Sequence, residues 1–422
     1  MLDMKFIREN PHVIKKDLEK RGNIEKQAWV DEIISKDEKY RKLLQKAQKL
    51  RAQRNAVSRD INRAKKEGKD IKKILAEARA IPDRIKRTEQ KGEKLKKDIL
   101  EKRMRLPNIL HESVPKGKDE SGNVVLREEG KKRKADFEMM PHGEWLEKKK
   151  QGDFKRAAKT SGAGFYFLKD KAALLDFALQ KFAIDKLAGK GYTLVEPPFM
   201  IRREPYEGVT DLADFENVMY KIDNDDLYLI ATSEHAIGAM HMNETFEEDM
   251  LPVKYAGISA CFRREIGSHG IDTRGLFRVH QFNKIEQFVF CRPEDSWKFH
   301  EELLANAEEL FKELELPYRV VNICTGDIGM LAAKKYDIEV WMPREGKYRE
   351  AVSCSNDTSY QAVRLNIKYK TADGKDYVHT LNSTAIATSR ALRAIIENNV
   401  QKDGTVLVPK VLLPYMNGVR KI

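Results

Sequence analysis

The sequence predicts an α+β protein in which a basic helical arm precedes a larger mixed body. Between Tyr40 and Ile99 apolar residues recur in alternating steps of three and four, which is the spacing of a coiled coil. From about residue 135 onward, helical and strand patterns interleave, as in an α+β or α/β body. The chain has 422 residues, which is long enough that two domains are expected.

The arm is predicted to be a helical hairpin on a short helical base, Met1–Lys26. Its two helices should each span roughly 35 residues, about 50 Å at the rise of an α-helix. The polar segment around Gly68 suits a reversal of direction between antiparallel helices, and Pro82 predicts a local kink. The apolar seam is expected at Tyr40, Leu43, Ala47, Leu50, Val57 and Ile61, and at Ile74, Ala78, Ile81, Ile85, Thr88, Gly92, Leu95 and Ile99.

The excess positive charge lies in this arm. Arg41 to Leu110 contains 24 Lys and Arg residues but 9 Asp and Glu residues, while the formal charge of the whole chain is +13. The rest of the chain is therefore close to neutral. A Lys-rich stripe is often only the solvated face of a helix. Because the excess is confined to one segment, binding to a nucleic-acid backbone is the favoured interpretation.

Other features of composition argue against membrane and secreted classes. No stretch approaches the roughly 18 apolar residues of a membrane span, and the start of the chain lacks the pattern of a secretory signal. The four cysteines, Cys261, Cys291, Cys324 and Cys354, form no CxxC pair. This usage fits reduced thiols in a cytoplasmic protein.

We expect residues 1–110 to form the arm domain, residues 111–134 a polar linker, and residues 135–422 the mixed body. In the body, Leu174–Leu187 is an amphipathic helix and Tyr192–Val195 a strand. The richest segment comes later: Ile258–Arg264 predicts one strand, Gly267–Gly275 a polar loop, and Phe277–Phe290 a second strand.

This strand pair carries groups that suit a nucleotide. Arginines such as Arg263 bind phosphate oxygens bidentately, and an aromatic residue such as Phe282 can cover a base. An Arg-Arg-Glu run alone is more often a surface ion pair. The Walker and dinucleotide glycine motifs are absent from the sequence.

Two further clusters favour polyphosphate chemistry. Glu350 and Ser353 offer hard oxygen ligands of the kind that hold Mg²⁺ with phosphates. Arg390 follows a run of small residues that begins at Asn382, and it precedes an Ala/Ile-rich helix. An arginine early in a helix, behind small residues, can reach a polyphosphate.

Together these segments resemble the class II aminoacyl-tRNA synthetases, and more narrowly the seryl-tRNA synthetases. The class II motifs are matched by Glu196–Met200, Cys261–Glu265, Val279–Glu286 and Asn382–Arg390. The narrower likeness rests on Leu50–Asn55, Thr232–Glu234, Arg274–Phe282 and Ser353–Asn356. It extends over nearly the whole chain, and the order and spacing of the motifs are more specific than any one of them.

The resemblance implies an antiparallel sheet flanked by helices, a homodimer in the cytoplasm, and a two-step reaction. L-serine and ATP would give seryl-adenylate, and the serine would then move to the 3′ end of tRNA(Ser), with tRNA(Sec) as a further acceptor. The basic hairpin would grip tRNA(Ser), especially its long variable arm.

The same resemblance implies roles for individual residues. Arg263 would hold the α-phosphate and the substrate carboxylate, Glu265 the adenine amino group, and Arg390 the γ-phosphate, while Phe282 stacks on adenine. Serine would be received by Thr232, Ser233, Glu234, Arg263, Glu286, Asn382 and Thr384. ATP would be bound by Arg263, Arg264, Glu265, Val279, Phe282, Glu350, Ala351, Val352, Ser353 and Arg390.

The implied metal is Mg²⁺ held by Glu350 and Ser353, and no zinc is expected. A zinc site of Cys261, Cys354 and Glu286 is the alternative, because a rare branch of the family uses zinc, but the hairpin signature belongs to the zinc-free form. Thr384 would bond the serine hydroxyl, which lets a site reject alanine.

The sequence departs from the family pattern where Gln-Ala-Arg-Arg is expected, since it has Gln361-Ala-Val-Arg364. Two other functions remain open. A ligase that charges a carrier protein should lack the basic hairpin, and a non-catalytic RNA-binding scaffold should lack Arg263, Glu265, Glu350 and Arg390. Neither loss is seen.

Overall fold

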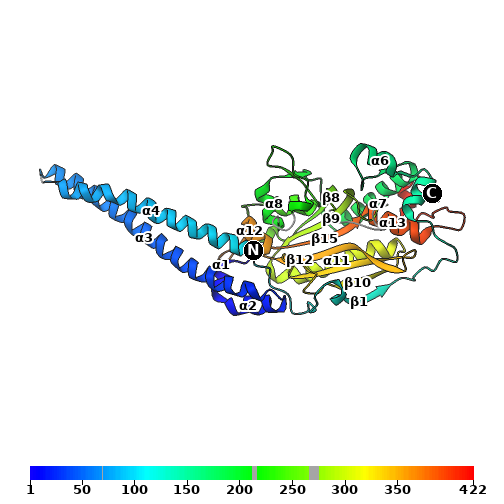
Figure 1. The fold of residues 1–422 in the computed structure, drawn as a ribbon, viewed down its shortest axis with the longest axis horizontal. Helices are drawn as coiled ribbons and strands as arrows, with labels where there is room; N and C mark the ends of the chain where they lie inside the picture. Colours follow the sequence, from blue (N-terminus) through cyan, green and yellow to red (C-terminus); the bar gives the residue numbers. More distant parts are fainter. Residues whose placement is uncertain (69, 212–215, 266–274) are drawn as a thin grey trace. The chain divides into compact units, whose positions relative to one another are not determined.

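The structure is a computed structural model that describes residues 1–68, 70–211, 216–265 and 275–422 (Figure 1). The chain divides into two compact units, Met1–Ile109 and Leu110–Ile422. Of the polar loop predicted at Gly267–Gly275, all but the last residue lies outside the described residues.

The first unit is the predicted hairpin on a helical base. The base contains α1 (Met4–Glu9), α2 (Pro11–Lys20) and the 3₁₀ turn η1 (Ile24–Lys26). The hairpin consists of α3 (Gln27–Lys66) and α4 (Lys72–Met104), which lie side by side along their lengths (Figure 1). The helical arm is therefore confirmed, and α4 continues past Pro82 to Met104.

The hairpin core is one narrow row of side chains at the predicted seam. Leu50, Val57, Ile81 and Ile85 are buried together, with Ile61, Ile74 and Ala78 packed beside them. Gly92 also belongs to the buried face. A Cβ at this position would lie 3.6 Å from the Tyr40 ring, an ordinary packing distance, so the ring of α3 packs directly over this point of α4.

The second unit is built on an eight-stranded sheet with the order β1-β10-β11-β12-β15-β9-β8-β4. All neighbouring strands are antiparallel except β4 and β8, so the expected antiparallel sheet is confirmed. The strands are β1 (Val124–Glu129), β4 (Thr193–Val195), β8 (Val253–Phe262), β9 (Gln281–Cys291), β10 (Tyr318–Asn322), β11 (Lys334–Met342), β12 (Lys347–Thr358) and β15 (His379–Ala387). Strand β1 comes from the segment expected to be a linker.

Helices cover both faces of the sheet. On one face α7 (Asp170–Gly189), α11 (Ser296–Glu313) and α13 (Thr388–Asn399) form the main core with Ile285 and Val289 of β9. The opposite face carries a second core, which Phe288 and Phe290 of β9 form with three shorter helices, α8 (Arg203–Val209), α10 (Ser233–Ala239) and α12 (Tyr360–Leu365). Phe288 and Phe290 alternate along β9 with Ile285 and Val289 of the main core.

Smaller elements complete the unit. The helices are α5 (His142–Lys148) and α6 (Phe154–Ser161), with the 3₁₀ turns η2 (Glu120–Gly122), η3 (Glu216–Val218), η4 (Glu248–Met250), η6 (Pro293–Asp295) and η7 (Lys410–Tyr415). The short strands are β2 (Gly152–Asp153), β3 (Phe167–Leu168), β5 (Met200–Ile201), β6 (Tyr228–Leu229), β7 (Thr245–Phe246), β13 (Lys368–Thr371) and β14 (Gly374–Tyr377). No described helix has the length and apolarity needed to cross a membrane.

Two predicted strand boundaries are wrong. The strand expected at Ile258–Arg264 runs from Val253 to Phe262. The strand expected from Phe277 begins at Gln281 instead. Phe277 does not join the sheet because its ring lies under the guanidinium groups of Arg349, Arg390 and Arg393, at 5.8, 5.3 and 4.8 Å. Periodicity along the chain gave no sign of these distant partners.

Candidate active site

A cavity of about 470 Å³ opens on the sheet face that carries α8 and α10. Its walls come from the start of α10, the end of β8, and the middle of β12 and β15. The predicted site residues that line it are Thr232, Glu234, Arg263, Glu265, Ser353 and Asn382.

Strand β9 supplies one edge of the site through alternate residues. Phe282, Lys284 and Glu286 share one face, since side chains alternate along a strand. Glu286 lies opposite Gly257 of β8. A Cβ at Gly257 would come within 2.5 Å of the Ser233 hydroxyl oxygen. The glycine therefore allows the first turn of α10 to approach the sheet.

Glu286 is 1% exposed and has two side-chain partners. The Lys284 ammonium lies 2.5 Å from its Oε2 atom, and the Thr384 hydroxyl donates a hydrogen bond of 3.3 Å to the same oxygen. Burial raises the pKa of Glu286, and the Lys284 charge opposes that rise. Sequence reasoning gave Lys284 no role in the site, although its place between Phe282 and Glu286 at a spacing of two was a signal.

Glu234 is a second buried acid beside this pair. It stands in the first turn of α10, where the Thr232 hydroxyl caps the helix by accepting a 3.2 Å hydrogen bond from the Glu234 backbone N–H. Burial raises the pKa of Glu234 to about 8, and the charges of Glu286 and Asp357 add to the effect. Burial and the acidic neighbours therefore disfavour the charged form of Glu234, although the Lys284 charge opposes the shift.

The neighbouring histidine does not act as a base here. Burial lowers the pKa of His235 to about 3, with the charges of Lys284 and Arg263 adding to the shift. The ring is therefore neutral at physiological pH. Burial also lowers the pKa of His379 to about 4.

Arginine and aromatic groups form the next part of the site. The Arg263 guanidinium lies 5.2 Å from the Phe282 ring centroid. The residue predicted to bind phosphate therefore contacts the residue predicted to stack on the base. Glu265 accepts a 2.7 Å hydrogen bond from Arg278, and Val279 is buried. Arg264 is exposed, with its backbone N–H bonded to the Val218 carbonyl.

The predicted metal ligands share a face because of a β-bulge. Residues three apart on a regular strand point to opposite faces. In the β11–β12 pairing, however, Ser353 lies opposite Asp337 and Glu350 lies opposite Glu339, and the register shifts at Ala351. Ala351 and Val352 are both buried in the main core. The bulge therefore turns Glu350 to the same side as Ser353.

Glu350 also meets the predicted γ-phosphate arginine. The Arg390 guanidinium lies 3.1 Å from the Glu350 carboxylate and donates a 2.9 Å hydrogen bond to its carbonyl. Burial acts to raise the pKa of Glu350, but the charges of Arg390, Lys335 and Arg263 outweigh it and lower the pKa.

A buried network of ion pairs around Arg393 packs next to Arg390 through the Phe277 ring. Arg393 is fully buried and pairs with both Glu345 and Glu397, the latter at 2.9 Å. Its guanidinium covers the Phe277 ring, which also lies under Arg390. These residues were not predicted, and only Arg393, one helical turn after Arg390, was recognisable as a candidate.

The serine-side residues on β15 are also buried. Asn382 donates a 3.3 Å hydrogen bond to Asp357, whose pKa is raised to about 7 by burial. Gln361 donates to the Val209 carbonyl at 3.0 Å. At the departure from the family pattern, Val363 is buried and apolar, while Arg364 holds two carbonyls of the α8 region.

Not every predicted residue lines the cavity. Those outside its lining are Ser233, Arg264, Val279, Phe282, Glu286, Glu350, Ala351, Val352, Thr384 and Arg390. Three of these residues still act on the site: Glu286 raises the pKa of Glu234, Phe282 contacts Arg263, and Arg390 pairs with Glu350. The side chains of Ala351 and Val352 are buried in the main core, so these two residues can face a ligand only through their backbone.

The arrangement suits activation of an amino acid by a nucleotide. Buried carboxylates can receive an ammonium group, arginines can neutralise phosphate and carboxylate charge, and an aromatic ring can hold a base. Among the described residues no group of three or more His, Cys, Asp or Glu side chains is placed to hold a metal ion.

Comparison with known families agrees with this chemistry. Residues 1–110 match the seryl-tRNA synthetase N-terminal domain. Residues 217–399 match the tRNA synthetase class II core domain (G, H, P, S and T).

Relatives match over the full length. The serine–tRNA ligase of Methanocella arvoryzae is 62% identical, with 99% of each chain covered, and that of Pyrococcus horikoshii is 52% identical, with 98% and 96% covered. The crystal structure of the Pyrococcus horikoshii seryl-tRNA synthetase complexed with ATP superposes with a TM-score of 0.93 at 50% identity, covering 100% of this chain and 99% of that one. The cytoplasmic Naegleria fowleri enzyme in complex with AMP gives a TM-score of 0.88 at 36% identity, covering 100% and 98%.

Proposed function

The chain belongs to the seryl-tRNA synthetase family and is a serine–tRNA ligase, and from this premise we propose how its residues divide the reaction. In the first step the serine carboxylate attacks the α-phosphate of ATP, and pyrophosphate leaves. In the second step the serine passes to the 3′ end of tRNA. Such chemistry depends on positioning and charge neutralisation more than on a protein nucleophile.

The observation that carries the assignment is the set of buried groups around Glu286. Glu286 and Glu234 receive the serine ammonium, with Thr232 and the Ser233 backbone at the start of α10 beside them. Thr384, whose hydroxyl is already bonded to Glu286, forms a hydrogen bond with the serine hydroxyl. Asn382 belongs to the lining of the same cavity. An alanine would leave these buried groups unpaired, which favours serine.

ATP is held on the arginine side of the same cavity. Arg263 binds the α-phosphate and the serine carboxylate, and Phe282 stacks on adenine with Val279 behind it. Glu265 bonds the adenine amino group, and Arg390 binds the γ-phosphate. Arg264, Ala351 and Val352 complete the nucleotide site, the last two through their backbone.

Mg²⁺ fits the oxygen donors of Glu350 and Ser353, because the bulge at Ala351 puts both on one face. Two protein ligands are enough for an ion that keeps water and phosphate oxygens around it. When bound there, the ion would neutralise phosphate charge. We retain the expectation that the site uses no zinc, which metal analysis of the purified protein tests.

Serine-dependent exchange of pyrophosphate into ATP tests the first step, and charging of tRNA(Ser) tests the second. Exchange with serine but not with alanine or threonine is the expected result. Folded protein that gives no exchange with serine and Mg²⁺ would contradict the assignment of this site. Charging of tRNA(Sec) is measured in the same assay.

The basic hairpin is the proposed contact with tRNA(Ser). Arg59, Arg63 and Lys66 are exposed near the end of α3, where their charge is available to phosphates. Replacing all three with Gln should leave exchange unchanged, weaken charging by about tenfold or more, and reduce the salt slope by about one per lost phosphate contact. Replacing the exposed Lys298, Lys312 and Lys375 of the second unit with Gln is the matched control.

We also propose a homodimer in the cytoplasm. The edge strand β4 and the segment after it expose large apolar side chains, which an edge rarely leaves in water. These are Leu194, Phe199 and Met200. Sedimentation of the full chain at twice its own mass is the expected result.

A further inference from the structure

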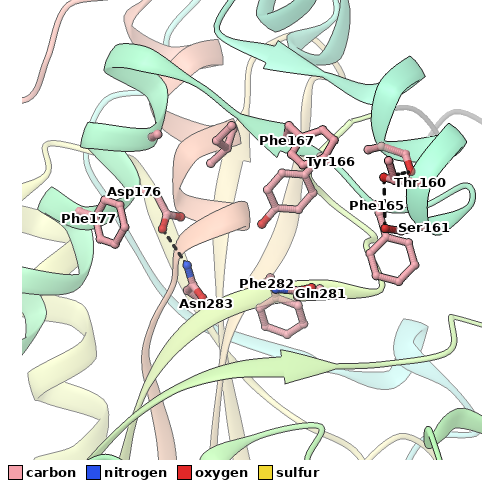
Figure 2. Close-up of a pocket in the computed structure, with 13 residues that line it drawn as sticks. Thr160, Ser161, Phe165, Tyr166, Phe167, Asp176, Phe177, Gln281, Phe282 and Asn283 are labelled. Atoms are coloured by element: carbon pink, nitrogen blue, oxygen red, sulfur yellow. Dashed lines mark hydrogen bonds between the residues drawn. The ribbon is translucent and has the colours of Figure 1, made fainter.

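A second cavity, of about 370 Å³, lies beside the first residues of β9, where Asn283 bonds Asp176 (Figure 2). Helices α6 and α7, strand β3 and the first residues of β9 enclose it. Its lining consists of Ala157, Thr160, Ser161, Phe165, Tyr166, Phe167, Leu168, Ala173, Asp176, Phe177, Gln281, Phe282 and Asn283. This volume is within the range of small-molecule sites.

One charged side chain stands in this lining. Asp176 of α7 is 4% exposed. Its Oδ2 atom accepts hydrogen bonds from Asn283 at 2.9 Å and Gln180 at 2.8 Å. Its Oδ1 atom is buried and accepts no hydrogen bond of standard geometry among the described residues, although the Thr388 hydroxyl lies near enough to the carboxyl to lower its pKa. A buried acceptor left in this state is unfavourable, so the site favours a ligand that donates.

The geometry directs this acceptor into the cavity. In Figure 2 the Asp176 carboxylate and the Tyr166 hydroxyl point toward the same space above β9. The pKa of Tyr166 is raised by burial and by the nearby charge of Asp176. Among the described residues, the lining contains no Lys, Arg or His, so this part of the chain offers no cation to Asp176 from the cavity wall.

The remaining walls are apolar and aromatic. Phe165, Phe167 and Phe282 join Tyr166 around the cavity. Phe177 lies on the lining with a side chain that is 66% exposed, so it marks the opening to solvent. Aromatic faces attract organic cations and also cover flat rings.

We propose that this cavity binds a small organic ammonium ion with an aromatic or apolar body. The ammonium group donates to Asp176 and Tyr166, and the body packs among the rings. A cation at this position offsets the burial that raises the pKa of Asp176. The site shares Phe282 with the nucleotide site and none of the other residues assigned to serine or ATP.

Two other ligand classes fit less well. A divalent metal needs several oxygen ligands, and Asp176 is the one carboxylate in the lining. A free amino acid carries a carboxylate as well as an ammonium, and the lining offers no cation to receive it. An amine without a carboxylate therefore matches the cavity best.

The cavity also borders the reaction site through β9. Asn283, which bonds Asp176, follows Phe282, and its carbonyl accepts a 3.2 Å hydrogen bond from the Thr388 hydroxyl at the start of α13. Arg390 is two residues further along that helix. An occupant therefore lies beside the strand segment that carries Phe282 and is linked through Asn283 to the start of the helix carrying Arg390.

Calorimetric titration of the full-length protein tests the proposal with two probes. Phenethylamine has a ring and an ammonium group, and L-phenylalanine adds only a carboxylate. We expect one saturable phenethylamine site per chain, and an affinity for L-phenylalanine at least about tenfold weaker, because a charged hydrogen bond is the discriminating contact. Absence of saturable phenethylamine binding overturns the proposal.

Variants locate the binding. Asp176→Asn should weaken phenethylamine binding by about tenfold or more, whereas Asp185→Asn on the exposed face of the same helix should not change it. Ala173→Phe fills the cavity and keeps Asp176, so it should abolish binding even if Asp176→Asn fails to fold. Wild-type affinity in folded Asp176→Asn or Ala173→Phe protein would place the amine elsewhere and overturn the assignment.

Discussion

The hairpin and the catalytic unit both depend on charge, but they hold it in opposite ways. In the hairpin, Arg51 and Glu89 pair across α3 and α4 with side chains that are 58% and 41% exposed. In the catalytic unit, Lys284 and Glu286 pair where both side chains are nearly completely buried.

This difference separates two uses of electrostatics. Exposed charges are screened by water and salt, so they attract a polyanion over a broad surface without fixing one geometry. Buried charges are costly unless each has a partner, so they fix one geometry and respond strongly when a partner is removed. The exposed charges of the hairpin therefore suit binding of a nucleic-acid backbone, and the buried charges of the catalytic unit suit selection of one small substrate.

The sharpest test of this contrast is Glu286→Gln. It leaves the Lys284 ammonium buried without its carboxylate and removes a receiver of the serine ammonium. Breaking a buried pair costs about 3–5 kcal/mol, and a loss of that size in the binding of the serine ammonium would lower kcat/KM for serine by roughly 150- to 5,000-fold. The exchange assay measures this, and Glu339→Gln, whose partner Arg319 is partly exposed, should stay near the wild type.

Next in size is Arg393→Met, which removes the buried cation between Glu345 and Glu397. We expect a loss of about 3 kcal/mol in the free energy of unfolding, because two buried carboxylates lose their partner. We also expect a higher KM for ATP with little change in the KM for serine, because Phe277 no longer supports Arg390 in its place. Thermal unfolding and exchange kinetics measure the two effects. An equal rise in both KM values would indicate a general loss of structure.

A smaller effect should appear with pH. The pKa of Glu234 is raised to about 8 by burial and by Glu286 and Asp357, so its carboxylate form becomes more populated as pH rises toward 8. For serine, kcat/KM should therefore increase about fivefold between pH 7 and pH 8. Glu234→Gln should flatten this profile. A profile that keeps its slope in the variant would assign the titration to another group.

The smallest effect is expected for Arg51→Gln on the hairpin. The ion pair with Glu89 is largely exposed, and such pairs contribute less than about 1 kcal/mol. Thermal unfolding should hardly change at physiological salt. A loss as large as that of Arg393→Met would show that the hairpin also depends on one fixed pair, and the contrast between the regions would fail.

Several features could be predicted from the sequence because their cause is local or periodic. The spacing of Leu50, Val57, Ile81 and Ile85 was enough to predict the hairpin seam, and these residues are buried together. The motif was enough to assign both Phe282 and Glu286 to the site, although Lys284 between them was given no role. The motifs also identified the family before any contact was known.

Other features depend on partners that are far apart in the chain. The bulge at Ala351 exists only in the pairing of β11 with β12, and it decides that Glu350 and Ser353 face one way. The departure of Phe277 from β9 depends on arginines from β12 and α13. Local pattern cannot reveal either one.

The sequence by itself determined the two-part organisation, the basic hairpin and the identity of the chemical groups. The tertiary structure alone decided which charges are buried together, as in Glu234 with Glu286, and which acceptor is left facing a cavity, as in Asp176. The reason is physical: periodicity and composition act along the chain, whereas burial and electrostatic coupling depend on distances that packing brings about.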